Sequence, residues 1–224
     1  MSERAADLND AFSDAPKTPG ILLAGGLARR IGGGDKPLRE IGGHSILSLV
    51  IARLAPQCDG LVLNANGDPA RFRTFGLPVI ADSVEGFAGP LAGILAGMDF
   101  AAANRPDAQW ILTAAADTPF LPGDLVARLH SARRSANAQI AVAASDGRSH
   151  HVVALWSVKL REDLRRALND ENINRVGEWI VRYRLASVDW PVMPFDPFFN
   201  INTPQDMAEA ERIATLEGEK SQRT

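Results

Sequence analysis

The chain has 224 residues, of which 46% are hydrophobic and 23% are charged, and its formal net charge is -3. This length and composition are typical of one folded α/β domain with a full hydrophobic core, and they exclude disorder of the whole chain. The negative net charge argues against a general nucleic-acid binder, because such proteins need a positive surface to bind phosphates.

The only cysteine, Cys58, excludes an internal disulfide and a cysteine-based metal cage. No apolar run approaches the ~20 residues that span a bilayer, and the first residues lack a hydrophobic segment for secretion. We therefore expect a cytoplasmic protein with no membrane partner. Residues 1–19 mix charged, small and proline residues without apolar periodicity, which predicts a disordered extension before a domain at 20–213 and a flexible tail at 214–224.

The stretch from Gly20 to Pro37 breaks from an apolar run into glycines, arginines and one lysine. A strand of Ile-Leu-Leu character delivers the backbone to the edge of a sheet, and glycines then let amide N–H groups approach an anion without an intervening Cβ atom. Arg29, Arg30 and Lys36 can offset phosphate charge there. This stretch therefore predicts a nucleotide phosphate site.

Two common nucleotide-binding motifs do not fit the same stretch. A Rossmann fingerprint runs G-x-G-x-x-G directly into a helix, whereas Leu27 and Arg29 interrupt that spacing. A P-loop needs Gly-Lys followed by Ser or Thr, but Asp35 precedes Lys36 and Pro37 follows it. A solvated glycine-rich loop is the remaining alternative, and the strand before it together with the lysine favours a binding site over that alternative.

Short apolar runs along the chain predict buried strands, and the segments between them predict amphipathic helices. The expected strands are Ile21–Ala24, Leu61–Asn64, Pro78–Ala81, Trp110–Ala115, Ile140–Ala144 and Val152–Trp156. The expected helices run from a Ser45 cap through Leu54, from Pro90 to Ala103 and from Pro122 to Arg134. This β-α-β alternation predicts a three-layer α/β/α sandwich with a mostly parallel sheet.

Polar residues follow the predicted strands at the points where the strands end. The glycine loop follows the first strand, Asn64-Ala65-Asn66 ends the second, and Asp82 and Asp117 follow the third and fourth. Because the carboxyl ends of parallel strands meet at one edge of a sheet, we expect these groups to converge. Any one of them alone would be interpreted as a turn residue.

Asp117 is the candidate magnesium ligand. Three alanines precede it and leave room for a ligand, and Pro119 fixes the turn just after the carboxylate. Magnesium is usually held by one or two carboxylates together with substrate phosphates and waters, so a single aspartate is sufficient. The alternative is an aspartate that only turns the chain before Pro119.

The segment from Asn200 to Asp206, with the sequence N-I-N-T-P-Q-D, has two interpretations that are equally supported. Asn202 and Thr203 only cap a following helix, or a polar side chain of the segment reaches the phosphates, as the family resemblance given below implies. The pair His150-His151 invites a metal interpretation, but no His or Cys stands at ligand spacing around it.

These motifs, together with G-P-L-A-G at 89–93 and D-T-P-F at 117–120, resemble sugar-nucleotide-type nucleotidyltransferases, and they most closely resemble the molybdenum cofactor guanylyltransferase family. The resemblance covers roughly Gly20 to Ile213 and implies a Rossmann-like nucleotidyltransferase fold. It also implies nucleotide contacts at Leu23, Ala24, Gly25, Gly26, Lys36, Asn64, Asp82, Asp117 and Asn200. Among these, Lys36 would meet the phosphates, Asp82 would accept hydrogen bonds from guanine, and Asp117 would bind Mg²⁺.

The reaction that the resemblance implies transfers GMP from GTP to the terminal phosphate of Mo-molybdopterin and releases pyrophosphate, with Lys36, Arg30 and Mg²⁺ stabilising charge on the triphosphate. His150 or His151 would touch the second substrate, although His151 stands where the family often has a proline. Other molybdenum cofactor biosynthesis proteins and apo-molybdoenzymes are further implied partners.

Two alternative functions stay open. Transfer of CMP or another nucleotidyl group to molybdopterin or to a sugar phosphate fits the same loop, because a phosphate cradle says little about the base. A noncatalytic nucleotide-binding module would also keep the glycine loop, although it could dispense with Lys36 and Asp117. A dehydrogenase is disfavoured, since the chain lacks its glycine spacing and the acidic residue ~20 positions later.

Overall fold

The computed structural model describes residues 16–25, 36–84 and 89–221, with only the helical backbone for 217–221. Its main-sheet strands are β1 (Gly20–Leu23), β4 (Leu61–Asn64), β5 (Val79–Ile80), β6 (Trp110–Ala115), β7 (Ile140–Ser145), β8 (Arg148–Ser157) and β9 (Leu185–Trp190). Their spatial order is β5-β4-β1-β6-β8-β7-β9, and the short strands β2 (Glu40–Ile41) and β3 (His44–Ser45) form a separate hairpin.

The α-helices are α2 (Ile46–Leu54), α3 (Pro90–Asn104), α4 (Leu125–Ala136), α5 (Arg161–Asn169), α6 (Val176–Ile180) and α7 (Pro204–Ser221). Short 3₁₀ helices lie at η1 (Lys36–Leu38), η2 (Pro69–Phe75) and η3 (Val158–Leu160). None of the helices in the described ranges combines the length and apolar character that crossing a membrane requires.

The sheet confirms the predicted, mostly parallel α/β/α sandwich. β1 pairs in parallel with β4 and β6, β4 pairs in parallel with β5, and β7 pairs in parallel with β9. β8 runs against its neighbours β6 and β7. The cause is a tight turn at Asp146-Gly147, where both residues have positive φ (47° and 70°), as two-residue hairpins require.

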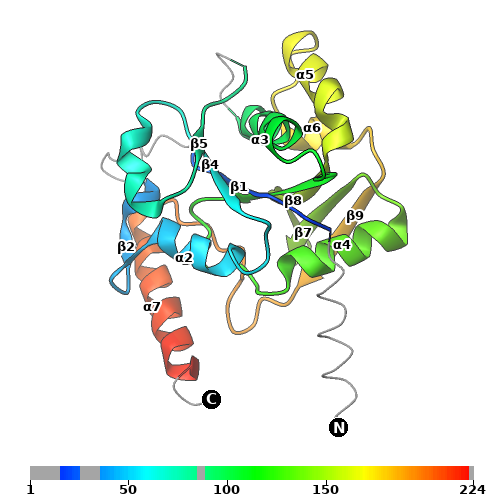
Figure 1. Ribbon diagram of the computed structural model, residues 1–224. Helices are drawn as coiled ribbons and strands as arrows, with labels where there is room; N and C mark the ends of the chain where they lie inside the picture. The colour runs from blue at the N-terminus through cyan, green and yellow to red at the C-terminus, as the bar shows by residue number, and fades with distance from the viewer. Residues whose placement is uncertain (1–15, 26–35, 85–88, 222–224) are drawn as a thin grey trace.

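Successive residues of each strand point to opposite faces of the sheet and so build two cores. Ile21 lies in a buried cluster with side chains from α3, α5 and α6, whereas its neighbour Leu22 lies in a cluster with side chains from α2 and α4. Figure 1 shows these two helix layers on opposite sides of the sheet. A third, smaller cluster joins β2 to α7 through Ile41 and Ile213.

Helix α3 lies close to the sheet because two glycines face the strands. A Cβ atom at Gly97 would lie 2.7 Å from Ile21 Cγ1, and one at Gly93 would lie 2.3 Å from Asn64 Oδ1. Both distances are shorter than van der Waals contact, so larger residues would push the helix away. Gly93 thus allows α3 to reach the end of β4.

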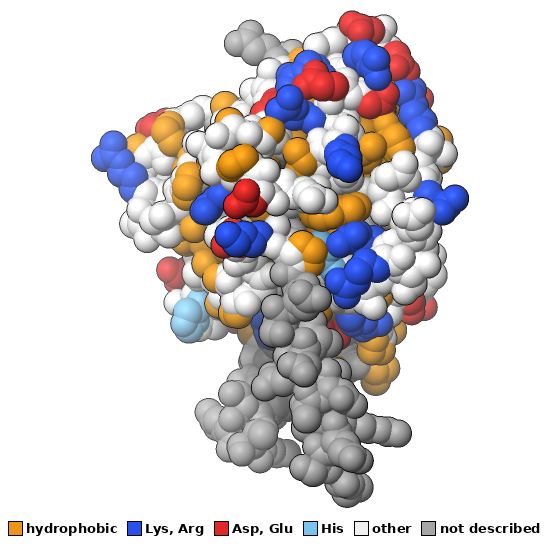
Figure 2. All heavy atoms as spheres, turned by 45° about the vertical axis from the view of Figure 1, so that its right-hand side comes forward, with side chains coloured by type: hydrophobic (Ala, Val, Ile, Leu, Met, Phe, Trp, Pro, Cys, Tyr) orange, Lys and Arg blue, Asp and Glu red, His pale blue; other side chains and the backbone are white. Residues whose placement is uncertain are grey.

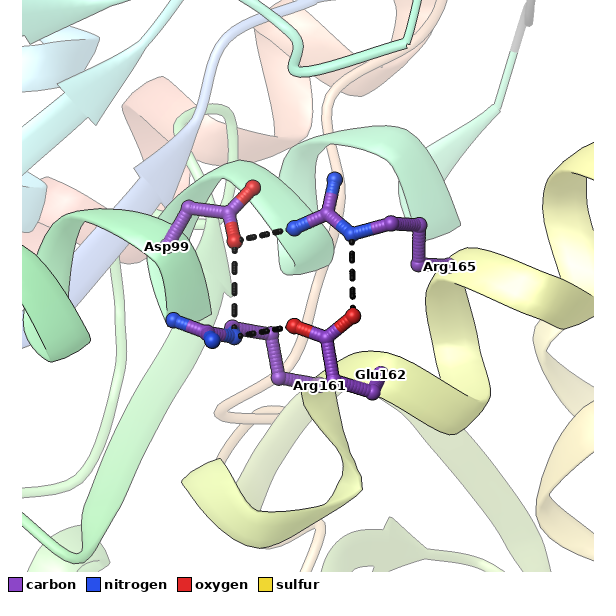
Figure 3. Close-up of polar contacts among 4 residues, drawn as sticks. All are labelled: Asp99, Arg161, Glu162 and Arg165. Carbon is purple, nitrogen blue, oxygen red and sulfur yellow. Dashed lines mark hydrogen bonds and ion pairs between the residues drawn. The ribbon is translucent and has the colours of Figure 1, made fainter.

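Ion pairs connect α3 to α5 on the outer surface (Figure 3). Asp99 Oδ1 lies 2.5 Å from Arg165 Nη2 and 3.7 Å from Arg161 Nε, while Glu162 contacts the same two arginines at 2.9 and 3.4 Å. Figure 2 shows acidic and basic side chains mixed in this way over the top of the molecule, where α5 lies. Such partly exposed pairs each contribute little to stability.

Several predicted boundaries shift in the structure. β5 is only Val79–Ile80, as suits an edge strand with one neighbour, and the helix expected from Pro122 begins at Leu125, after a turn closed by Leu125 N–H and Pro122 O at 3.4 Å. Residues 16–19 join the fold, since Thr18 is buried, and α7 continues through the expected boundary at 213. Residues 1–15 and 222–224, which make up the rest of the predicted extension and tail, lie outside the described ranges.

Candidate active site

The candidate site lies at the carboxyl edge of the sheet, around the end of β1. Leu23 pairs with Asn64 of β4 on one side and with Ala115 of β6 on the other. The Ala24 N–H donates to Asn64 O at 2.9 Å, and the Ala116 N–H donates to Leu23 O at 3.0 Å. Polar residues at the ends of these three strands are therefore held at fixed positions relative to one another, as predicted.

Lys36 brings a nearly buried ammonium group into this edge, with only 8% of the residue exposed. Its Nζ donates to Asp117 Oδ2, to Asn202 Oδ1 at 2.8 Å and to Asn200 Oδ1 at 3.3 Å. A buried charge is costly unless it is paired and hydrogen-bonded, and the three oxygen acceptors match the three N–H donors of a lysine. These hydrogen bonds hold the start of η1, which follows the glycine loop, against the segment after β6 and the segment before α7.

Asp117 uses only one of its two carboxylate oxygens in this arrangement. Oδ2 is paired with Lys36, whereas Oδ1 is buried and has no hydrogen-bond partner among the described residues. An orphaned buried oxygen of this kind needs an explanation, and an oxygen-seeking cation such as Mg²⁺ supplies one. The described residues contain no group of three or more His, Cys, Asp or Glu side chains that could hold a metal by themselves. The site therefore fits a cation that also takes ligands from substrate phosphates and water.

The segment before α7 places two asparagines against Lys36. Ile201 is fully buried, and its N–H donates to Asp117 O at 3.2 Å. Asn200 and Asn202, on either side of Ile201, both reach Lys36 Nζ through their side chains. The register of this segment is thus set by one buried residue and one backbone hydrogen bond.

The same segment also caps α7. Asp206 Oδ2 accepts hydrogen bonds from the N–H groups of Asn202 (2.7 Å) and Thr203 (2.8 Å), and Thr203 Oγ1 accepts one from Asp206 N–H at 3.1 Å. This reciprocal pattern is a capping box. Burial raises the pKa of Asp206, but these hydrogen bonds outweigh it and hold the pKa below its usual value. Helix capping and contact with the site therefore coexist, and the contact that the structure describes is with Lys36.

A second polar group lies beside the first, at the ends of β4 and β5. The Asp82 carboxylate accepts hydrogen bonds from Asn64 Nδ2 at 3.0 Å and from Asn66 Nδ2 at 2.7 Å. Asn64 is buried, Asp82 is half-buried and Asn66 is exposed. The sequence predicted Asn64 and Asp82 at this edge, and the structure adds Asn66 as a contact of Asp82.

The two histidines of the pair point to different surroundings. His150 Nε2 lies 2.7 Å from Ser145 Oγ, and its ring packs on Phe198 at 4.7 Å between centroids. Burial lowers the pKa of His150, and Arg148 and His151 lower it further against the raising effect of Asp196.

His151, by contrast, lines a cavity of about 660 Å³ with Pro90, Val152, Asn174, Arg175, Val176, Gly177 and Glu178. This cavity opens beside the first turn of α3. The backbone of Val152, one of the lining residues, is held by a hydrogen bond from Thr113 Oγ1 to its carbonyl oxygen at 2.7 Å. Of the two histidines, only His151 is among the residues that line this cavity.

The remaining predicted residues lie at or after the end of β1. Leu23 and Ala24 are half-buried and Gly25 is exposed, with open space where its Cβ atom would be. Gly26 and Arg30 lie outside the described residues. Asn202 and Asn66 were named in the sequence analysis within their segments, but not as individual nucleotide contacts. Both stand in an N-x-N pattern, whose two-residue spacing places both asparagines on one side of an extended backbone.

Residues 20–186 match the family model of the MobA-like NTP transferase domain. A protein of Rhodopseudomonas palustris (strain BisB5) named molybdenum cofactor guanylyltransferase is 67% identical over 203 residues, which cover 91% of this chain and 97% of that protein. Among solved structures, molybdopterin-guanine dinucleotide biosynthesis protein A from Archaeoglobus fulgidus aligns with a TM-score of 0.68 at 23% identity, covering 88% of this chain and 99% of that one. Rv0371C from Mycobacterium tuberculosis H37Rv, solved as a complex with manganese, aligns with a TM-score of 0.64 at 19% identity and covers 88% and 99% of the two chains.

Proposed function

This chain belongs to the MobA-like NTP transferase family, and we propose that it acts as a molybdenum cofactor guanylyltransferase. In the proposed reaction, GMP passes from GTP to the terminal phosphate of Mo-molybdopterin. An oxygen of that phosphate attacks the α-phosphorus of GTP in line, the bond from the α-phosphorus to the bridging oxygen breaks, and pyrophosphate leaves. No covalent enzyme intermediate is needed, so catalysis consists of positioning and charge stabilisation.

The observation that carries the proposal is the unpaired Oδ1 of Asp117 beside the ammonium of Lys36. One free carboxylate oxygen and one cation, both close to the ends of parallel strands, suit a nucleoside triphosphate bound with a divalent metal. We propose Mg²⁺ as that metal and Asp117 as its protein ligand. When bound, it neutralises charge on the triphosphate and makes the leaving pyrophosphate more stable.

The protein's own residues divide the remaining work. Lys36 supplies fixed positive charge to the triphosphate, and Asn200 and Asn202 hold its ammonium in place. The backbone of Leu23, Ala24 and Gly25 is proposed to contact the nucleotide. Arg30 and Gly26 are proposed to complete the phosphate cradle.

We propose that the polar group at the ends of β4 and β5 selects the base. Asp82 is proposed to accept hydrogen bonds from guanine, with Asn64 beside it. The pterin substrate is proposed to enter next to His151, in the cavity at the first turn of α3.

The cytoplasm is the proposed location. The free thiol of Cys58 fits a reducing compartment, and burial raises its pKa to about 12, which keeps it protonated and unreactive. The product would pass to other molybdenum cofactor biosynthesis proteins or to apo-molybdoenzymes.

The proposal is tested with the purified protein, Mo-molybdopterin, Mg²⁺ and α-labelled GTP, followed by separation of labelled products. We expect a labelled pterin dinucleotide together with released pyrophosphate. Parallel reactions with CTP, ATP and UTP show which base is chosen, and reactions without the pterin show whether transfer needs that acceptor. Preferential transfer from CTP would overturn guanylyl specificity, and binding of GTP without any transfer would indicate a noncatalytic module.

A further inference from the structure

Asn66 contacts Asp82 in two ways at once. Its Nδ2 donates to Asp82 Oδ2 at 2.7 Å, and its Oδ1 accepts a hydrogen bond from the Asp82 backbone N–H at 2.9 Å. These two bonds have opposite polarity and join the side chain of one residue to both the backbone and the carboxylate of the other. The orientation of the carboxylate relative to its own backbone is therefore fixed.

The position of Asn66 is itself fixed. Arg71 Nη2 donates to the carbonyl oxygen of Asn66 at 2.6 Å, and Gly67 follows with a φ of 85°, so the chain turns away directly after Asn66. One residue earlier, the Ala65 N–H donates to Ile80 O at 2.9 Å. The side chain thus projects from an anchored backbone, although Asn66 is exposed.

The Asp82 carboxylate keeps acceptor capacity in this arrangement. Its two oxygens offer about four acceptor positions in total. Among the described residues, Asn64 Nδ2 takes one at Oδ1 and Asn66 Nδ2 takes one at Oδ2, which leaves each oxygen able to accept another hydrogen bond. Two free acceptor positions side by side match a flat ligand edge that carries two adjacent N–H donors.

Among the common bases, guanine carries such an edge, with its N1–H next to its 2-amino group. Cytosine and adenine present one amino group beside an acceptor nitrogen, and uracil presents one N–H between two carbonyls. A site that hydrogen-bonds both donors rejects ligands that lack one of them, because a polar group is then left unpaired. This discrimination requires the carboxylate plane to stay aligned with the base.

We propose that Asn66 is a positioning residue for base selection: it acts through Asp82, by holding the carboxylate in the orientation that pairs with the guanine edge. This inference rests on the proposed function, which assigns Asp82 to the nucleoside. Asn66 meets this requirement because it carries a donor and an acceptor at the right separation. Aspartate there would lack the donor and would place a second negative charge against Asp82.

The decisive comparison is between GTP and inosine triphosphate, which lacks the 2-amino group, in wild type and in Asn66→Ala. We expect the KM for GTP to rise roughly fivefold to thirtyfold in Asn66→Ala, the effect of losing one or two hydrogen bonds, with a small change in kcat. The preference for GTP over inosine triphosphate shrinks in parallel. Asn104→Ala is the matched control, since Asn104 is also exposed, lies at the far end of α3, and its side chain donates to the Phe100 carbonyl at 3.0 Å.

A merely structural role for Asn66 would give a different result. The same hydrogen bonds tie the end of β4 to the segment after β5, so their loss could lower Tm without any effect on base choice. A lower Tm with an unchanged ratio of GTP to inosine triphosphate turnover therefore overturns the proposal. Asn66→Asp extends the test, and we expect it to weaken GTP binding at least as much as Asn66→Ala.

A double-mutant comparison tests whether Asn66 acts through Asp82. In an Asp82→Ala background, we expect Asn66→Ala to change the Kd for GTP by less than about twofold, because coupled residues are not additive. Fully additive effects would contradict the proposal. If the wild type neither binds nor uses GTP, the proposed function fails; if the wild type prefers GTP and Asn66→Ala prefers it equally, only the inference about Asn66 fails.

Discussion

Lys36 and Asp117 form an ion pair across 81 positions of sequence, and this pair leaves one carboxylate oxygen of Asp117 buried and unpaired. The pair joins Lys36, two positions after the last glycine of the loop, to Asp117, two positions after the end of β6. In the described part of the chain, a cation and an unpartnered, buried carboxylate oxygen thus lie together at the carboxyl edge of the sheet. Replacing either partner should therefore reduce the rate of catalysis much more than it reduces the stability of the fold.

Asp117→Asn should reduce turnover by at least about a hundredfold, because the amide removes the negative charge that a divalent cation needs. Lys36 keeps the side-chain oxygens of Asn200 and Asn202 as partners, so we expect Tm to fall by only about 2–4 °C. The measurement is the rate of dinucleotide formation as the Mg²⁺ and Mn²⁺ concentrations are varied. Asp107→Asn is the control, since Asp107 is exposed at the opposite end of β6, and full activity of Asp117→Asn would exclude a metal-binding role.

Lys36→Met should weaken GTP binding and lower turnover by about a hundredfold or more, because the triphosphate loses a fixed positive charge. Methionine fills a similar volume but leaves Asp117 Oδ2 and two amide oxygens without their donor, so stability should fall by about 1–3 kcal/mol. Titration calorimetry with GTP and urea unfolding measure the two effects separately. Lys159→Met, at an exposed lysine, is expected to change neither quantity. An unchanged Kd for GTP in Lys36→Met would count against the phosphate role.

The elements that the sequence predicted best are those with strong local signals. Leu61–Asn64 and Trp110–Ala115 appear with the predicted bounds because they are continuous apolar runs. Helix α2 starts where Ser45 predicts it, with Ser45 Oγ accepting from Ser48 N–H at 3.1 Å. The local sequence is sufficient to specify these elements, and their packing against neighbouring elements favours the same structure.

Two features that the sequence analysis did not predict have different causes, one local and one that depends on contact between distant segments. The antiparallel direction of β8 follows from the Asp146-Gly147 turn, a local signal that was not used. The pairing of Lys36 with Asp117 has no local signal, because no spacing rule relates residues so far apart. The sequence thus predicted which residues gather at the sheet edge but not which of them bond to one another.

Gly93→Ala and Gly97→Ala should both destabilise the protein, by about 1–3 kcal/mol each, because their new Cβ atoms overlap Asn64 Oδ1 and Ile21 Cγ1. Only Gly93→Ala should also raise the KM for GTP, since Asn64 donates to Asp82 at 3.0 Å. Gly123→Ala is the control, because a Cβ atom there would meet nothing within 4 Å. Equal KM values in the two helix variants would show that Asn64 does not transmit the strain to the nucleotide site.

His130 should make stability depend on pH below neutrality. Its ring is fully buried, Nδ1 accepts from Arg133 Nε at 3.0 Å, and Nε2 lies 2.8 Å from Thr18 Oγ1, which itself donates to Pro16 O at 2.6 Å. Because Nδ1 accepts and the threonine hydroxyl already donates elsewhere, Nε2 carries the single proton of a neutral ring. Burial, followed by the positive charges of Arg133 and Arg134, lowers the pKa of His130 from 6.5 to about 3.

The sign of the effect follows from proton binding in the two states. Between pH 6.5 and about 3, the unfolded chain binds a proton at His130 that the folded protein does not bind, so the free energy of unfolding falls as pH falls. The slope of the free energy of unfolding against pH that His130 contributes approaches about 1.4 kcal/mol per pH unit, and it falls to zero below the pKa of His130 in the folded protein. Urea unfolding from pH 7.5 to pH 4 of wild type and His130→Gln isolates it, because other titrating groups are common to both. We expect the stability advantage of the wild type to be largest near neutrality and to shrink steadily toward pH 4, while His44→Gln, at an exposed histidine, keeps the wild-type slope. A constant difference between wild type and His130→Gln across this range would mean that His130 titrates alike in both states.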